Sequence, residues 1–555
     1  MFMRLLLLCP MIVRAIKIIF LLLLGLFYFF KIYAQEHQHS HRHEIQKLEH
    51  EAKHFFEKGE YYSALKIYLK LDTINKQLPL YKFRIGLCYF NMGRDDMAVP
   101  YFEECLKTPN AQPGSLYFFL AKCYQYQHRW DKAQEFYEKY KTYLKTVKDE
   151  KAALVIQSIN REIDNIKIAQ KIINQKNNVV VKNLGKRINT IYPEYGPIVS
   201  ADEKILIFTA CRPDTKGGKI EVQDGRYKED IYISYKEEDG LWGVPKPISV
   251  NINTEENEAA VALSPDGHKL IIYRHSSSKK SENESGDLYI SEFNGIDWSV
   301  PQKLDGKINS TFWEPSATIT SDERVMIFAS NRKGGLGGTD LYIIRKKPDG
   351  TWNEPQNLGP KINTKFDEDA PFLHPDGKTL YFSSNGLEGM GEFDIYYTQY
   401  DDEKKEWSTP KNLGYPINSA RDDLYITWSS DGKRAYFSSM RNDGEGDKDI
   451  YVAYFEDYPP ADLLLMMGTI RDSEKHDIIQ NFMVTLIDQT TDEIVGLYQT
   501  EEKNGKYLIV FQEGIKYKIQ ISAPGYKTLS ENFELTKNAG FKTITKDYFL
   551  EKENQ

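Results

Sequence analysis

Between residues 178 and 457 one pattern occurs five times, and this repetition constrains the fold more than any other feature of the chain. An Asp-apolar-Tyr triplet recurs at Asp230, Asp287, Asp340, Asp394 and Asp449. A turn aspartate recurs in step with it, at Asp202, Asp266, Asp322, Asp376 and Asp431. Each unit holds four short β-rich runs separated by Gly, Asp and Asn turns, which is typical of one four-stranded propeller blade. The sequence therefore predicts a β-propeller over residues 178–457.

The two ends of the repeat array predict how it closes. A Trp-x-x-Pro feature occurs at Trp242, Trp298, Trp352 and Trp407 but is absent after the fifth triplet. The missing outer strand has a counterpart at the front, where residues 179–190 carry the same Asn-Leu-Gly and Ile-Asn-Thr sequences that follow Trp352. We therefore expect this segment to complete the last blade, giving five blades and no open sheet edge. The units resemble the WD40-like (PD40) repeats of TolB-type propellers, which belong to exported Gram-negative envelope proteins.

Every unit also carries a carboxylate six residues after the Ile of its Ile-Asn pair. These residues are Glu194, Glu258, Glu314, Glu368 and Asp423. One interpretation is an acidic ring at the mouth of the propeller channel, which would attract a cation or a partner bearing Lys or Arg. The other is that each carboxylate caps backbone N–H groups of its own or the next blade. The sequence favours the second, because repeats preserve packing features.

Residues 1–34 are predicted to be a signal peptide. Lys17 precedes an apolar run, and Ala34 before Gln35 is a suitable cleavage site, with an uncleaved anchor as the alternative. Residues 35–50 are predicted to be disordered; their four histidines, an alternative metal-binding tract, are His37, His39, His41 and His43. His50-Glu51-Ala52-Lys53-His54 has the letters of a zinc-protease motif, but no third ligand follows at a recognisable spacing.

Residues 51–177 change to helical periodicity with a repeat of about 34 residues. Small residues Ala64, Ala98 and Ala133 are each followed four residues later by an aromatic residue. This spacing resembles the tetratricopeptide repeat (TPR), in about three copies with a capping helix. The resemblance implies a concave face that binds a peptide or protein, with a helical spacer as the alternative. Cys88, Cys105, Cys123 and Cys211 are either disulfide partners or small packing residues.

Residues 462–551 contain short alternating strands with Asn-Gly and Pro-Gly turns, which predict a small β-sandwich. Gly468-x-Ile470-x-Asp472 and Ala523-Pro524-Gly525-Tyr526 resemble the carboxypeptidase regulatory-like domain, a transthyretin-like sandwich without peptidase chemistry. The predicted fold class is thus multidomain: a TPR array, a five-bladed β-propeller and a transthyretin-like β-sandwich.

This domain order resembles PorE-like envelope proteins of the OmpA family, some of which serve type IX secretion. Their C-terminal OmpA-like domain is missing before Gln555, so direct peptidoglycan binding is not expected. The net charge of −8 argues against nucleic acid as a partner. Gly-x-Ser-x-Gly is absent, and no enzymatic activity, cofactor or metal is predicted. We expect an exported scaffold or adaptor that binds proteins of the periplasm or outer membrane through the TPR concave face and the propeller faces. The alternatives are a glycan- or peptide-binding protein and, less favoured, a propeller associated with a hydrolase.

Overall fold

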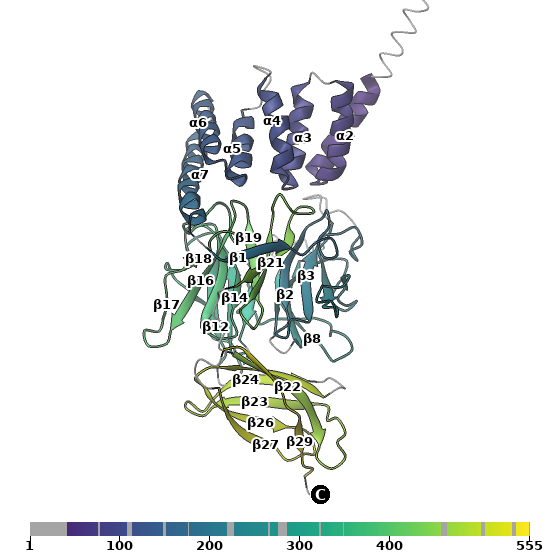
Figure 1. Ribbon diagram of the computed structural model, residues 1–555, viewed down its shortest axis with the longest axis vertical. Helices are drawn as coiled ribbons and strands as arrows, with labels where there is room; N and C mark the ends of the chain where they lie inside the picture. Colours follow the sequence, from purple (N-terminus) through teal and green to yellow (C-terminus); the bar gives the residue numbers. More distant parts are fainter. Residues whose placement is uncertain are drawn as a thin grey trace, which may run out of the picture.

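The computed structural model shows three regions that follow one another along the long axis of the molecule (Figure 1). It describes residues 42–75, 78–107, 114–147, 151–175, 177–218, 227–264, 267–275, 286–320, 323–347, 349–456, 463–500, 505–535 and 540–553. The predicted signal peptide, most of the histidine tract and the turn residues Asp266 and Asp322 lie outside this part of the chain.

The first region is an array of antiparallel helices, which we call the helical array. It consists of a helix over residues 42–57, α2 (Tyr61–Ile74), α3 (Pro79–Asn91), α4 (Asp95–Leu106), α5 (Leu116–Tyr126), α6 (Trp130–Thr146) and α7 (Ala152–Ile173). Residues 42–50 are helical, so the prediction of disorder up to residue 50 was wrong for this part. Ile45 and Leu48 pack on the core of the first helices, and this burial extends the helix toward the N-terminus.

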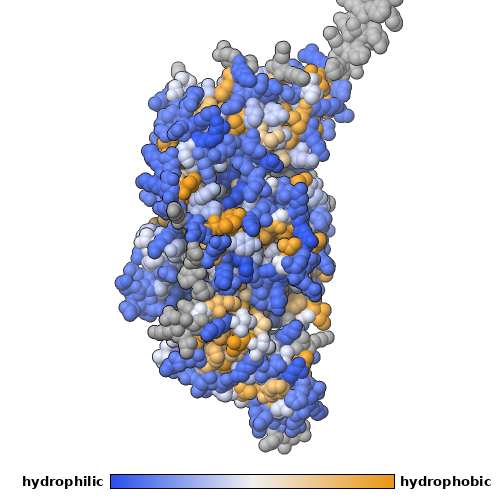
Figure 2. Space-filling model, viewed as in Figure 1, coloured by the Kyte–Doolittle hydropathy of each residue, from blue (hydrophilic) through white to orange (hydrophobic). Residues whose placement is uncertain are grey.

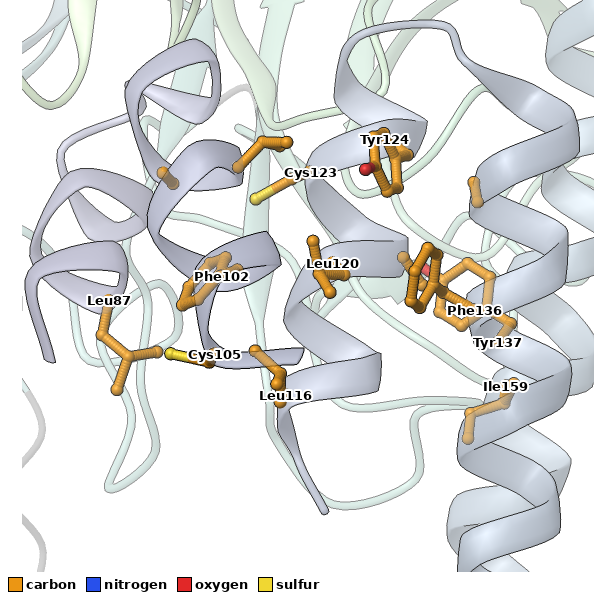
Figure 3. Packing of buried hydrophobic residues seen from close by; sticks show 14 of the residues in the cluster. Leu87, Phe102, Cys105, Leu116, Leu120, Cys123, Tyr124, Phe136, Tyr137 and Ile159 are labelled. Carbon is orange, nitrogen blue, oxygen red and sulfur yellow. The ribbon is translucent and has the colours of Figure 1, made fainter. Parts of the chain in front are cut away.

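Close approach of small and large side chains holds the array together. The predicted small residues Ala64, Ala98 and Ala133 are fully buried. At Gly86 a methyl group would lie only 2.4 Å from the ring of Phe102. The ring thus occupies the space that a side chain at position 86 would need. Figure 3 shows the same core continuing across the later helices. The array therefore has two buried apolar clusters, one among its first helices and one that extends from α3 to α7.

The middle region consists of five antiparallel sheets in the described part of the chain, numbered here in chain order. Sheet 1 contains β2 (Glu194–Val199), β3 (Ile205–Ala210), β4 (Asp230–Tyr235) and β5 (Lys246–Pro247). Sheet 2 contains β6 (Asn257–Leu263), β7 (Lys269–His275), β8 (Asp287–Glu292) and β9 (Gln302–Lys303). Sheet 3 contains β10 (Ala317–Ile319), β11 (Val325–Ser330), β12 (Asp340–Arg345) and β13 (Gln356–Asn357).

The last two sheets of this region have the same order of strands. Sheet 4 contains β14 (Glu368–Leu373), β15 (Thr379–Ser384), β16 (Asp394–Asp401), β17 (Glu406–Trp407) and β18 (Lys411–Asn412). Sheet 5 contains β19 (Asp423–Trp428), β20 (Arg434–Ser439), β21 (Asp449–Phe455) and, from the front of the region, β1 (Val179–Asn183). β1 pairs antiparallel with β21, as predicted for the segment that completes the last unit.

The register of the strands repeats with the sequence. The Tyr of the triplet lies opposite a Phe of the preceding strand in four sheets, in the pairs Phe208–Tyr232, Phe328–Tyr342, Phe382–Tyr396 and Phe437–Tyr451. On its other side the same Tyr pairs with the outer strand. In sheet 3 Tyr342 lies opposite Asn357 of β13, and in sheet 5 Tyr451 lies opposite Asn183 of β1. The first strands of the five sheets contact one another in the cyclic order β2, β6, β10, β14, β19 and back to β2.

The third region follows with two further sheets around one apolar core. One contains β22 (Leu463–Asp472), β25 (Lys506–Gln512), β28 (Lys542–Thr545) and β29 (Tyr548–Leu550). The other contains β23 (Phe482–Asp488), β24 (Glu493–Thr500), β26 (Lys516–Ser522) and β27 (Leu529–Glu534). On the face seen in Figure 2, hydrophobic residues form scattered patches on a largely hydrophilic surface. None of the described helices combines the length and the apolar character that crossing a bilayer requires.

Candidate interaction sites

Buried asparagines fix the loops that connect neighbouring sheets. Each lies in the loop after an outer strand, and its side-chain amide exchanges two hydrogen bonds of 2.8 to 3.0 Å with one backbone residue of the third strand. The pairs are Asn189–Ile450, Asn253–Ile231, Asn309–Leu288, Asn363–Leu341 and Asn418–Ile395. These asparagines are the Asn of the Ile-Asn pairs, so that sequence feature has a structural role.

The five predicted carboxylates lie next to these loops and are fully buried. Each accepts hydrogen bonds from the backbone N–H and the hydroxyl group of the residue four positions earlier; these residues are Thr190, Thr254, Ser310, Thr364 and Ser419. An arginine joins four of the five sites, as Arg212, Arg274, Arg332 and Arg441. Glu194, Glu258, Glu314, Glu368 and Asp423 therefore cap the loops between sheets and do not form an open acidic ring.

Burial dominates the electrostatics of these sites. It raises the pKa of Glu194 to about 7, although Arg212 at 2.7 Å and the bonds from Thr190 oppose the shift. Burial likewise raises the pKa of Asp423, against the opposing effect of Arg441. Such carboxylates join adjacent sheets and are not accessible to a ligand.

Sheet 4 differs from the others and contacts the helical array. Gly386 occupies the place of the arginine, and a methyl group there would lie 1.8 Å from the hydroxyl oxygen of Thr364. Arg161 of α7 reaches this loop instead: it donates to the carbonyl of Asn385, and its guanidinium lies 3.7 Å from the ring centroid of Phe366. The array therefore supplies a cation where the repeat lacks one.

A buried ion pair anchors the array on sheet 5. Arg421 lies 2.5 Å from Asp95 at the start of α4, and both side chains are almost inaccessible to water. Burial raises the pKa of Asp95 to about 6, while Arg421 opposes this shift. The guanidinium also lies 3.9 Å from the ring centroid of Tyr126. Removing either charge would leave the other one buried without its partner.

A second polar cluster lies beside this pair. Lys122 of α5 contacts Glu162 of α7 at 2.9 Å and Glu392 of the middle region at 3.3 Å. Tyr126 donates a hydrogen bond of 2.7 Å to the same Glu392. Burial alone would raise the pKa of Glu392, but Lys122 and Tyr126 outweigh it and hold the pKa below its usual value. The array and the middle region are thus joined by buried, directional contacts.

Half-buried aromatic side chains line one side of α3 and α5. Phe90 contacts Phe119 at 5.2 Å and Tyr126 at 6.0 Å between ring centroids, and Phe119 contacts Phe83 at 6.1 Å. The run ends at Arg421. Aromatic side chains with one face accessible are common anchors in protein interfaces. Phe83 itself is buried in the core, so the half-buried Phe90, Phe119 and Tyr126 form the array's candidate contact surface.

A cavity of about 610 Å³ lies along the centre of the middle region. The first strands of all five sheets form its wall, and Val495, Gln512 and Ile515 of the third region line one end. Gln512 donates a hydrogen bond to the carbonyl of Pro375 there. The opposite end is the side on which the helical array docks. At this array-facing end, the polar and aromatic residues that line the cavity are Tyr195, Glu229, Tyr273, Trp313, Tyr425 and Lys448.

The sequence did not single out these cavity residues, because they do not repeat. Tyr425 has a left-handed backbone conformation, with φ of 58°, at an irregularity in the pairing of β19 with β20. The matching irregularity in β2 has Gly196 and that in β14 has Ala370. An irregularity of this kind redirects the side chain, and here it directs that of Tyr425. A tyrosine at this position occurs in sheet 5 but not at the matching positions of sheets 1 and 4. A departure from the repeat was the available signal.

The remaining predicted residues have structural positions. Cys88, Cys105 and Cys123 are buried in the array and are not bridged to one another, and Cys211 is buried after β3. Burial raises the pKa of the Cys88 thiol to about 12. His50 and His54 are exposed on the first helix, and in the described part of the chain no three His, Cys, Asp or Glu side chains are grouped to hold a metal.

Comparison with known proteins identifies one repeat. A tetratricopeptide repeat model matches residues 81–111, which contain most of α3 and all of α4. No curated protein matches the chain. The helical array thus contains a TPR, and this repeat indicates protein–protein interaction in general terms.

Three solved structures show distant likenesses. A structure of a BT0996 RGII complex is 9% identical; the match covers 52% of the present protein and 94% of the solved one, with a TM-score of 0.37. The type III secretion translocator chaperone SycD of Yersinia enterocolitica is 17% identical and covers 23% and 86%, with a TM-score of 0.21. An α-L-arabinofuranosidase from Lactobacillus brevis is 17% identical and covers 53% and 96%, with a TM-score of 0.33. Scores this low carry no argument about fold or function.

Proposed function

We propose that this chain is a non-enzymatic scaffold of the cell envelope that binds partner proteins through its helical array. The observation that carries the proposal is the TPR at residues 81–111, in an array fixed to the middle region by the buried Asp95–Arg421 pair. A binding module held in this way keeps a partner in a defined orientation relative to the rest of the chain. We further propose that the five sheets form a five-bladed propeller and that the third region is a regulatory-like sandwich.

The proposed location is the periplasm or the outer membrane, with type IX secretion as one setting. This part of the proposal comes from the predicted signal peptide and from the domain order. The alternative is an exported protein that captures a glycan or a peptide, and the central cavity of about 610 Å³ favours the capture of a peptide side chain as a second candidate.

Photo-crosslinking in intact cells tests the scaffold role on the full chain. A photoreactive amino acid is placed at one exposed position of each region: Leu80 of the array, Val250 of the middle region and Phe549 of the third region. The tagged protein is then purified and its adducts are identified by mass spectrometry, alongside fractionation of the envelope. Discrete adducts from Leu80 with envelope proteins are expected. A chain without adducts at any position, recovered soluble with bound glycan or peptide, would favour the alternative.

A further inference from the structure

Four aromatic side chains meet at the array-facing end of the central cavity, and the proposed scaffold role does not use them. The rings of Tyr195 and Tyr425 lie 5.7 Å apart. The indole N–H of Trp313 donates a hydrogen bond of 3.1 Å to the hydroxyl of Tyr273. All four line the cavity, and Trp313 is 40% exposed, so one side of the group is open to solvent. The faces of such rings attract cations.

Carboxylates surround these rings. Glu229 accepts a hydrogen bond from the hydroxyl of Tyr195 and lines the cavity itself. Burial, together with the negative charges of Asp369, Glu229 and Asp422, raises the pKa of Tyr425 well above its usual value. Among the described residues lining the cavity, Lys448 is the one ammonium, and it lies 3.8 Å from Asp422. Of these carboxylates, Glu229 lies in the cavity lining at this end, while Asp422 pairs with Lys448 and Asp369 accepts a hydrogen bond from Ser316 behind it.

The body of the cavity has a different character. Its wall combines apolar side chains of the five first strands with hydroxyl groups, several of which already have partners. Ser316 donates to Asp369, Thr318 accepts from the backbone of Leu373, and Thr427 donates to the carbonyl of Pro197. A sugar there would lose water from many hydroxyl groups without replacement, whereas a hydrocarbon stem would not.

We propose that the cavity binds an ammonium group on a slender apolar stem, with the charge among Tyr195, Tyr273, Trp313 and Tyr425 beside Glu229 and the stem in the channel. Tyr425 supports a role in binding, because it places a ring in the cavity where the same left-handed position of the neighbouring sheets has Gly196 or Ala370. Two sources share this chemistry: an alkyl diamine and the lysine side chain of a peptide. The proposal goes beyond the scaffold role and is independent of it.

Three probes with the same stem test the charge requirement. Hexylamine, hexanol and sodium hexanoate are titrated into the full chain, and binding is followed by calorimetry and by saturation-transfer NMR. Hexylamine is expected to bind at least about tenfold more tightly than hexanol, since the faces of desolvated aromatic rings attract a cation. Hexanoate should bind weakest. Equal binding of the three probes, or no binding of hexylamine, would overturn the proposal.

Two substitutions locate the site. Glu229→Gln keeps the shape and removes the charge, and Trp313→Ala removes a half-exposed ring, so each should lower hexylamine affinity about tenfold. Glu238→Gln makes the same chemical change in the exposed turn between β4 and β5 and should have no effect. Thermal melts check folding, and Trp313→Ala serves if Glu229→Gln does not fold. Variants that bind like the unaltered chain would overturn the assignment.

A final pair of probes separates the two sources. 1,5-Diaminopentane has an ammonium group at each end of its stem, and Nα-acetyl-lysine methylamide has one at the end of a lysine side chain attached to a peptide unit. Tighter binding of the lysine derivative assigns the site to a peptide, and tighter binding of the diamine assigns it to a small cation. If neither probe binds, the proposal is overturned.

Discussion

The helical array and the five-sheet region are both built from repeats, but their units are joined in different ways. In the array, contact depends on shape: Gly86 leaves the space that the ring of Phe102 fills. Between the sheets, buried polar groups are added to shared apolar clusters: Asn363 bonds to both backbone groups of Leu341, and Glu368 caps the adjoining loop. Shape complementarity tolerates small shifts of a helix, whereas paired hydrogen bonds fix direction and register.

The boundary between the two regions combines both kinds of contact. Arg421 stacks on Tyr126 and pairs with Asp95 in a buried setting. The comparison shows that buried polar contacts, among them the Asp95–Arg421 pair and the Lys122–Glu392 pair, couple a region held by shape to one whose loops are fixed by hydrogen bonds. The same comparison predicts which substitutions should change stability most and which least.

The largest effect is expected at the boundary. Arg421→Met leaves Asp95 buried without its partner, and we expect a loss of about 3–5 kcal/mol in the free energy of unfolding. Calorimetry should then show the array and the sheets melting separately. Arg187→Met is the control, because Arg187 and Glu237 form an exposed pair worth under about 1 kcal/mol. Equal shifts from the two variants would contradict the coupling.

The next effect is expected between the sheets. Asn363→Ala leaves the N–H and C=O of Leu341 without their side-chain partner, at a cost of about 3 kcal/mol. Urea unfolding measures it. Asn353→Ala, at an exposed position of the same sheet, should change stability by less than about 0.5 kcal/mol. If both variants unfold alike, the asparagine bonds do not join the sheets.

Within the array a smaller loss is expected. Gly86→Ala places a methyl group against Phe102, and the overpacking, reduced by the better helix propensity of Ala, should cost about 2 kcal/mol. The double variant Gly86→Ala/Phe102→Leu makes room and should recover part of this loss. Chemical denaturation of the unaltered chain, the two single variants and the double variant completes a double-mutant cycle. An additive result would show that the two residues do not interact.

The smallest effect is a dependence on pH. Burial raises the pKa of Asp449 to about 6, and one of its carboxylate oxygens has no hydrogen-bond partner in the described part of the chain. Because the folded state holds the proton more tightly, this contribution is present below about pH 4 and is lost as the pH rises through 6. Asp449→Asn should flatten the decline by about 1 kcal/mol between pH 4.5 and 7, measured by urea unfolding. Parallel pH profiles would refute this.

Repetition decided what the sequence could predict. The period, the four strands of each unit and the pairing of residues 179–183 with the last sheet followed from residues that recur, such as the Asn of each Ile-Asn pair. The offset of Glu194 and its counterparts was also found, but spacing alone could not distinguish a ring at the mouth from a buried cap. The structure distinguishes the two, because each carboxylate is buried and accepts hydrogen bonds from the residue four positions earlier.

Features that occur once escaped prediction. Tyr425, Trp313 and Glu229 come together only when the five sheets surround one cavity, and no sequence spacing links them. The contact of Arg161 with the loop of Asn385 depends likewise on the array docking on sheet 4. The helix over residues 42–50 was missed because its apolar residues are interrupted by charged and histidine residues.

The pairing of β1 with β21 has a consequence for the time course of synthesis. Asn183 leaves the ribosome 266 residues before Asp449, to which its side chain bonds. At about 5–20 residues per second this interval lasts roughly 13 to 53 s. Throughout it the strand has no partner, while the helices before it can already fold. The seam of the middle region therefore closes last, and a chain shortened before residue 449 keeps an unpaired strand that quality-control proteases and chaperones can recognise.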